Sequence, residues 1–201
     1  MENKNNDYGV FVSENSAFDF SFLYPRAWHA REIKGSNYDE VFVAGPRNAE
    51  NTFTLALIVR VTIARDQNGK QTPLENFIAE YLTKLHAAQG FELRAQSSGK
   101  LANVRATEIE ITYTTLLPPN NINATRTQIM ERRIFLQREN RIYEMIWRAT
   151  APDYAQSLGV FKRVVQTFEF QDAPRETYQP FIIPAPAALA LAEERAEYKT
   201  P

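Results

Sequence analysis

The chain has 201 residues, enough for one domain with a sizeable core plus extensions but short for two full domains. Its 23 Lys and Arg against 24 Asp and Glu give a net charge of −1, which provides no positive field for binding nucleic acid or anionic lipid. At 44% hydrophobic residues the chain is expected to fold, and without cysteine it has no disulfide, thiolate metal ligand or cysteine nucleophile.

The sequence divides into three regions. Residues 1–16 form a polar N-terminal lead, residues 17–171 a globular body, and residues 172–201 a proline-rich C-terminal arm. The lead lacks the apolar stretch of a secretory signal, and no apolar run is long enough to span a bilayer. We therefore expect a cytoplasmic protein, although removal of an export signal would leave the same pattern.

Alternating apolar residues predict a series of strands. The first carries Phe18, Phe20 and Phe22 on one face, and Pro25 ends it in a turn that can bring Trp28 into the core. Later strands follow the same period of two, separated by polar turns. The expected strands span residues 18–22, 40–44, 52–64, 92–98, 104–114, 125–137, 141–149 and 168–170.

Two segments change to a helical period. The run Thr72-Pro73-Leu74-Glu75 is typical of a capping box with proline at the first helical position, and an apolar stripe continues from it to Leu85. Gly90 is placed to cap the end of this helix, and a second helix is expected after Pro152. The order of strands, helix, strands and helix predicts an α+β fold with a central antiparallel β-sheet and segregated helices.

Taken in order, these landmarks resemble the PsbP-like superfamily, which includes accessory proteins of photosystem II and DcrB-type bacterial proteins. The resemblance rests on Phe20-Ser21-Phe22-Leu23-Tyr24-Pro25-Arg26-Ala27-Trp28, the helix from Thr72, the run 141–152 and the ending 161–170. It covers the body and none of the arm. It implies a central antiparallel sheet sandwiched by helices, no enzymatic activity in the characterised branches, and docking onto larger assemblies.

No residue pattern indicates catalysis. His29 and His86 lie far apart in the sequence, and we interpret both as surface residues, so no metal site is expected. Glu108 and Glu110 point to the same side of one strand, where a solvated face explains them without acid–base chemistry. We expect no enzyme, no catalytic residue and no cofactor.

Arginines gather along the late hairpin, and two interpretations stay open. They form either a surface for an acidic partner or cross-strand pairs with glutamates on an exposed sheet face. The arginines are Arg126, Arg132, Arg133, Arg138, Arg141 and Arg148, and the glutamates are Glu131, Glu139 and Glu144.

The arm carries apolar residues outside the core. Its prolines exclude helix over residues 178–186, whereas residues 187–198 have high helix propensity and only a thin apolar stripe. Leaving a large apolar side chain in water costs about 1.5–3 kcal/mol relative to burial, so the arm should pack either on its own sheet or on a partner. The expected partner-binding residues are Tyr178, Phe181, Ile182, Ile183, Leu191 and Tyr198.

Two functions follow from these patterns. The first is a non-enzymatic accessory or assembly subunit that docks onto a larger protein complex, which can be membrane-associated, through its sheet face and C-terminal arm. The alternative is a binding protein or chaperone that holds a small ligand or an apolar peptide on the concave face of its sheet. A deep apolar cavity lined by Trp28, Phe53, Tyr113 or Trp147 would favour the alternative. Neither hypothesis involves nucleic acid.

Overall fold

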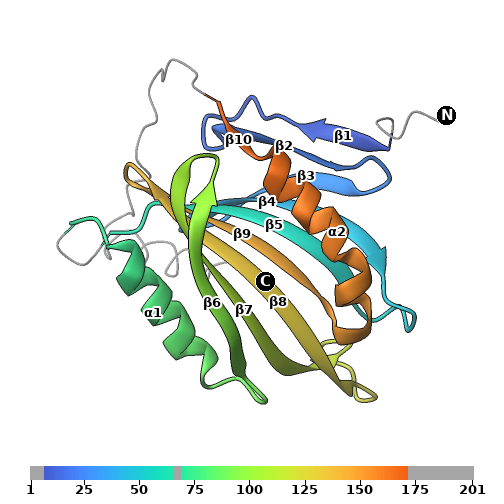
Figure 1. The fold of residues 1–201 in the computed structure, drawn as a ribbon. Coiled ribbons are helices and arrows are strands. Elements are labelled where there is room, and N and C mark those ends of the chain that lie inside the picture. Colours follow the sequence, from blue (N-terminus) through green and yellow to red (C-terminus); the bar gives the residue numbers. More distant parts are fainter. Residues whose placement is uncertain (1–6, 66–68, 172–201) are drawn as a thin grey trace, which may run out of the picture.

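The computed structural model describes residues 7–65 and 69–171 (Figure 1). This part of the chain forms a seven-stranded sheet, a three-stranded sheet and two helices. In chain order the elements are β1 (Tyr8–Phe11), β2 (Phe20–Pro25), β3 (His29–Lys34), β4 (Tyr38–Arg47), β5 (Thr54–Thr62), α1 (Leu74–Leu85), β6 (Glu92–Leu101), β7 (Val104–Leu117), β8 (Thr125–Arg138), β9 (Arg141–Thr150), α2 (Ala151–Thr167) and β10 (Glu169–Phe170).

The large sheet is antiparallel, with the strand order β3-β4-β5-β9-β8-β7-β6. Its flanks pair strands that follow each other in sequence, whereas its centre joins β5 to β9 from distant parts of the chain. Helix α2 and the small sheet, β1-β2-β10, pack on one face, and α1 packs on the other. The predicted α+β fold with a central antiparallel sheet between helices is confirmed.

The face under α2 and the small sheet holds the main core. The alternating phenylalanines of β2 and its approach are all buried, as predicted, and Phe20 is fully enclosed. Trp28 stacks on Trp147 with ring centroids 5.8 Å apart, and Trp147 in turn packs against Phe161 of α2. We call this side of the sheet the closed face.

Several local predictions differ from the structure. Residues 8–11, assigned above to the polar lead, form β1 and pair with β2, and residues 29–34 form the edge strand β3, which the sequence analysis did not identify. The capping box is wrong, because α1 begins after Pro73 with no side-chain hydrogen bond at its cap. Gly90 has a positive φ of 66°, but it lies in the turn before β6, beyond the helix end at His86.

Among the helices that the structure describes, neither combines the length and the apolarity needed to cross a membrane.

Candidate binding cleft

Helix α1 covers only part of the sheet face opposite α2. Ile78 and Tyr81 of the helix pack on Ile109, Ile111 and Phe135 of β7 and β8. No described helix packs against the same face of β4, β5 and β9. We call this part the open half-face. Its side chains include Tyr38, Glu40, Phe42, Ala56, Ile58, Arg60, Glu144, Ile146 and Arg148.

An apolar row crosses the middle of the open half-face. The strand register places Phe42 opposite Ile58, and Ile58 opposite Ile146. Ile58 and Ile146, together with Ala56, form a small cluster separate from the main core, with Phe42 packed against it. The alternation of β5 therefore supplies apolar side chains to both faces of the sheet, because Leu57 on the same strand belongs to the closed face.

A charged row runs beside the apolar one. Arg60 lies opposite both Glu40 and Glu144 in the register, and its Nη2 is 2.9 Å from Glu40 Oε2. The Arg60 guanidinium also lies 4.2 Å from the centre of the Tyr38 ring. Arg60 is thus held by a carboxylate and an aromatic ring on its own sheet.

Arg133 forms the centre of a buried ionic network beside α1. Its Nη2 lies 2.7 Å from Glu131 Oε1, and its Nη1 lies 2.5 Å from Glu144 Oε2. The Tyr81 hydroxyl of α1 donates a hydrogen bond of 2.7 Å to Glu131, and the Tyr81 ring lies 4.0 Å from the guanidinium. Arg133 is 8% exposed and the two glutamates are 3% exposed each.

The network and its burial shift the pKa values of Arg133 and Tyr81. Burial alone would lower the pKa of Arg133, but the carboxylates of Glu131 and Glu144 outweigh it and raise that pKa. Burial raises the pKa of Tyr81, so its hydroxyl remains a hydrogen-bond donor to Glu131. One guanidinium therefore holds both carboxylates, and the pair is not arranged as a general acid and a general base.

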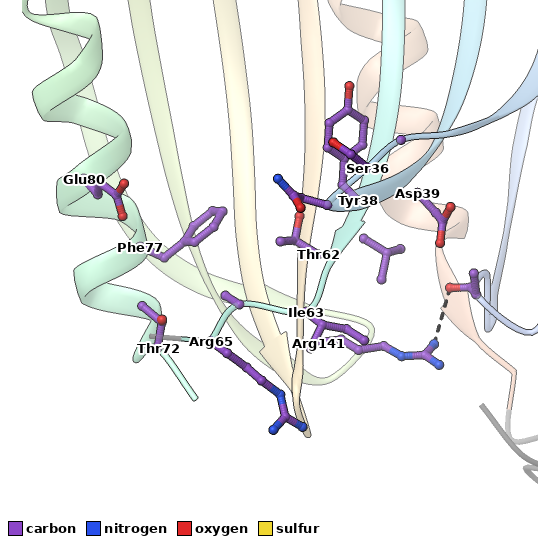
Figure 2. A pocket seen from close by; sticks show the side chains of 15 residues that line it. Ser36, Tyr38, Asp39, Thr62, Ile63, Arg65, Thr72, Phe77, Glu80 and Arg141 are labelled. Atoms are coloured by element: carbon purple, nitrogen blue, oxygen red, sulfur yellow. Dashed lines mark hydrogen bonds between the residues drawn. The ribbon is translucent and has the colours of Figure 1, made fainter. Parts of the chain in front are cut away.

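Two adjoining cavities lie where α1 meets the open half-face. The larger one, about 460 Å³, lies near the β3–β4 turn and the end of β5, and the smaller one, about 260 Å³, lies against Arg60 and Arg133. Phe77 and Glu80 of α1 line both cavities, so we treat the two as one α1 cleft. Figure 2 shows Phe77 reaching from the helix toward Thr62 of β5.

The far end of the cleft carries two ionisable side chains, Asp39 and Arg141. Burial raises the pKa of Asp39, and the charges of Lys34 and Arg141 partly oppose that rise. Arg141 also donates a hydrogen bond of 3.3 Å to the backbone oxygen of Ala17, which lines the same cavity. This end of the cleft therefore lies next to the segment that leads into β2.

The residues considered for chemistry do not come together. His29 and His86 are both exposed, and among residues 7–65 and 69–171 no three His, Asp or Glu side chains are placed to hold a metal ion. The solvated face expected for Glu108 and Glu110 is wrong in part. Both carboxylates pair with Arg132, at 3.1 and 2.8 Å, and Tyr154 of α2 donates a hydrogen bond to Glu110, because α2 covers this face of β7.

The arginines of the late hairpin do not form one surface. Successive residues of β8 point to opposite faces, so Arg132 lies on the closed face and Arg133 on the open side. Arg138 and Arg141 both contact Asp19 instead. The interpretation as ion pairs with glutamates describes Arg133, but the pairs are buried and not on an exposed face. The remaining members are Arg126, which is exposed near the β7–β8 loop, Arg148, which lies on the open half-face beside Tyr113, and Glu139, which lies in the β8–β9 turn.

The apolar cavity that would have favoured a ligand-binding protein is not formed by the expected residues. Trp28, Phe53, Tyr113 and Trp147 line neither part of the α1 cleft, and Trp147 is fully buried in the main core. The larger part of the cleft lies at the end of the sheet, where Val61 and Arg141 line it together with Tyr38 and Phe77, and the cleft mixes apolar with charged residues. The sequence signal that could have located it is the set of charged residues inside predicted strands.

The arm residues expected to bind a partner lie outside the described residues. They are Tyr178, Phe181, Ile182, Ile183, Leu191 and Tyr198.

No family model and no curated protein matches the chain. Several solved structures resemble it in fold. A protein of unknown function from Pseudomonas aeruginosa, described as a putative regulator, matches with a TM-score of 0.52 at 13% identity, covering 86% of this chain and 100% of the other. LpqN of Mycobacterium tuberculosis, described as involved in cell envelope biogenesis, matches with a TM-score of 0.53 at 8% identity, covering 84% and 94%.

Cyanobacterial PsbP from Synechocystis matches with a TM-score of 0.49 at 11% identity, covering 82% of this chain and 92% of the other. At these identities the likeness concerns the fold alone. The central antiparallel sheet with a helix on each face agrees with the architecture that the resemblance implies. The chain shares its fold with the Pseudomonas protein and with LpqN.

Proposed function

We propose that this protein is a non-enzymatic accessory or assembly subunit that docks onto a larger protein complex. The docking surface is the open half-face with its α1 cleft, together with the C-terminal arm, residues 172–201. The observation that carries the proposal is a sheet face that no described helix covers over β4, β5 and β9, next to a cleft that extends along α1.

The charges of the cleft favour docking over chemistry. Acid–base catalysis needs carboxylates or imidazoles held with shifted pKa values where a substrate can reach them. Here Glu131 and Glu144 both bind Arg133, and Glu40 binds Arg60. These ion pairs shape and stiffen a surface, and they leave little charge to act on a substrate.

The fold neighbours fit this role. The description of LpqN names cell envelope biogenesis, and that of the Pseudomonas protein names a putative regulator. Neither description names a reaction. An accessory role is therefore in keeping with both.

The test is partner capture with matched variants. Ser36 is exposed and lines the cleft, so Ser36→Trp should obstruct it, whereas Ser98→Trp makes the same change on the exposed edge strand β6. We expect crosslinking and mass spectrometry to identify a partner that binds the wild type and Ser98→Trp and is lost with Ser36→Trp. Equal capture by Ser36→Trp and Ser98→Trp would reject the cleft as the docking surface.

One observation favours the alternative, a protein that holds a small ligand or an apolar peptide. The cleft has the volume of many small-molecule sites, which span roughly 300–1,000 Å³. Native mass spectrometry of the purified protein should then show a bound molecule in the wild type and in Ser98→Trp that Ser36→Trp lacks. A single unliganded mass in all three would exclude a retained ligand.

A further inference from the structure

We infer that, when the chain is on its own, residues 172–201 occupy the α1 cleft and the open half-face, so that the arm is an intramolecular ligand of this surface. This rests on the proposed function in one respect: a partner that docks on this face must first displace the arm.

The arm starts next to the α1 cleft. The Gln171 amide, at the end of the described chain, donates a hydrogen bond of 2.8 Å to the Asp19 backbone oxygen. The Asp19 carboxylate lies 3.6 Å from the guanidinium of Arg141, and both Arg141 and Ala17 line the larger cavity (Figure 2). The chain therefore leaves the described structure at one end of the α1 cleft.

The arm is also long compared with the surface. Thirty residues follow Gln171. An extended segment of this size reaches roughly 100 Å, whereas the nine residues of β5 span about 30 Å. The arm is thus long enough to run along the cleft and to cross the open half-face.

The apolar row of the open half-face leaves one large side chain partly exposed. Ala56, Ile58 and Ile146 are 1%, 4% and 1% exposed, so these three side chains are already buried. The hydrophobic side chain packed against them from the described part of the chain is that of Phe42. Phe42 is half-buried, so it is the apolar side chain of this row that a further segment can cover.

The composition of the arm suits the open half-face. The arm contains Phe181-Ile182-Ile183 between Pro180 and Pro184, a short apolar stretch whose flanking prolines disfavour a helix. Burying each of these side chains is favourable by about 1.5–3 kcal/mol. The cations Arg60 and Arg133 already have carboxylate partners, so an apolar segment suits the open half-face better than an acidic one.

Covalent connection favours the arm over a separate molecule. A segment tethered beside its site acts at an effective concentration of about 1 mM or more. The same segment in solution must reach that concentration to compete. A partner that docks here must therefore bind more tightly than the arm does.

The experiment places a spin label on the arm of the full chain. Because the chain has no cysteine, Ala188→Cys gives a single attachment site for a nitroxide. We expect the label to remove most of the amide signal intensity of residues 58 and 146 on the open half-face, and to leave residues 98 and 159 unaffected. The chemically reduced label provides the reference spectrum and shows that the labelled chain is folded.

A matched variant tests the contact. Adding Phe181→Asp, Ile182→Asp and Ile183→Asp to the labelled chain should restore the lost intensities. A synthetic peptide of residues 172–201 should then perturb the open half-face of this variant at concentrations that leave the wild type unchanged. If the wild-type label leaves residues 58 and 146 as intense as residue 98, the arm does not occupy this face.

A mixture of isotope-labelled chain without a spin label and spin-labelled chain of natural isotope abundance distinguishes a contact within one molecule from a contact between two molecules. Signal loss in the mixture would show that the arm of a second copy fills the cleft, which would overturn the intramolecular inference. The two proposals can fail separately. The spin-label result needs no partner, and the capture experiment with Ser36→Trp and Ser98→Trp reports on the docking partner whatever position the arm takes.

Discussion

The closed face and the open half-face belong to one sheet but are built in different ways. On the closed face, aromatic and aliphatic side chains from β2, α2 and six strands of the large sheet form one continuous core. On the other face, a single helix covers β7 and β8, and the neighbouring strands carry a narrow apolar row beside buried ion pairs.

The difference shows where this chain places stability and where it leaves room for binding. Apolar burial is non-directional and grows with area, and a gap in the close-packed core of the closed face lowers stability. A buried ion pair adds little net stability, because desolvation offsets its attraction, yet losing one member is costly. The open half-face thus has a fixed shape that another chain segment can recognise.

The largest loss of stability is expected on the closed face. Phe20 is fully buried, and its ring centre lies 5.2 Å from that of Phe168 and 5.9 Å from that of Phe11. Phe20→Ala should lower the free energy of unfolding by about 3–5 kcal/mol, because it leaves a cavity. Denaturant unfolding measures this. The matched change Phe42→Ala, at a half-buried position of the open half-face, should cost less, and an equal cost would mean that both faces are packed alike.

Removing Arg133 should be almost as damaging for a different reason. Arg133→Met leaves Glu131 and Glu144 buried without their cation, which costs about 3–5 kcal/mol in denaturant unfolding. Adding Glu131→Gln and Glu144→Gln should recover most of the loss, since the uncompensated charges are then gone. If the triple variant is as unstable as Arg133→Met, shape and not charge governs this site.

Sequence patterns predicted the closed face well, because burial of one strand face leaves a period of two in the chain. Phe18, Phe20 and Phe22 show it, and so do the alternating residues of β9 around Trp147. The edge strand β3 was missed because its residues 29–34 are mostly polar and exposed. Edge strands often have this composition, and it resembles that of a loop.

The open half-face could not be derived in the same way. In the sequence, nothing distinguishes Arg60, Arg133 and Glu144 from solvent-exposed charged residues. The register of β5, β9 and β8 brings them together. The capping box failed because Thr72 matches the motif, yet the cap position is taken by Pro73, whose side chain accepts no hydrogen bond. A short motif indicates the local backbone conformation, whereas the pairing of distant strands determines which side chains form the site.

Alkaline pH should weaken the side of the sheet that α1 covers. Burial raises the pKa of Tyr113 to about 12, with the nearby Glu131 carboxylate acting in the same direction, from about 10 in the unfolded chain. The contribution to stability is complete below pH 10 and is lost as the pH rises to about 12, by up to about 1.4 kcal/mol per pH unit for this group. Denaturant unfolding between pH 9 and 12, with tyrosinate absorbance, follows it. Tyr113→Phe should flatten the slope, and native tyrosinate absorbance that rises no later than in the unfolded chain would contradict it.

The smallest effect is expected at the exposed rim of the cleft. Lys84 Nζ lies 2.7 Å from Glu80 Oε1 on α1, but the two side chains are 73% and 63% exposed. Lys84→Gln should change the free energy of unfolding by no more than about 0.5 kcal/mol, and added salt should erase the difference, because water and ions screen this pair. The same chemical interaction is therefore expected to matter about tenfold less in energy at Lys84 than at Arg133. A loss above 1 kcal/mol at Lys84, measured by the same unfolding assay, would show that the rim is less solvated than its exposure indicates and that the contrast between the two sides of α1 is smaller than proposed.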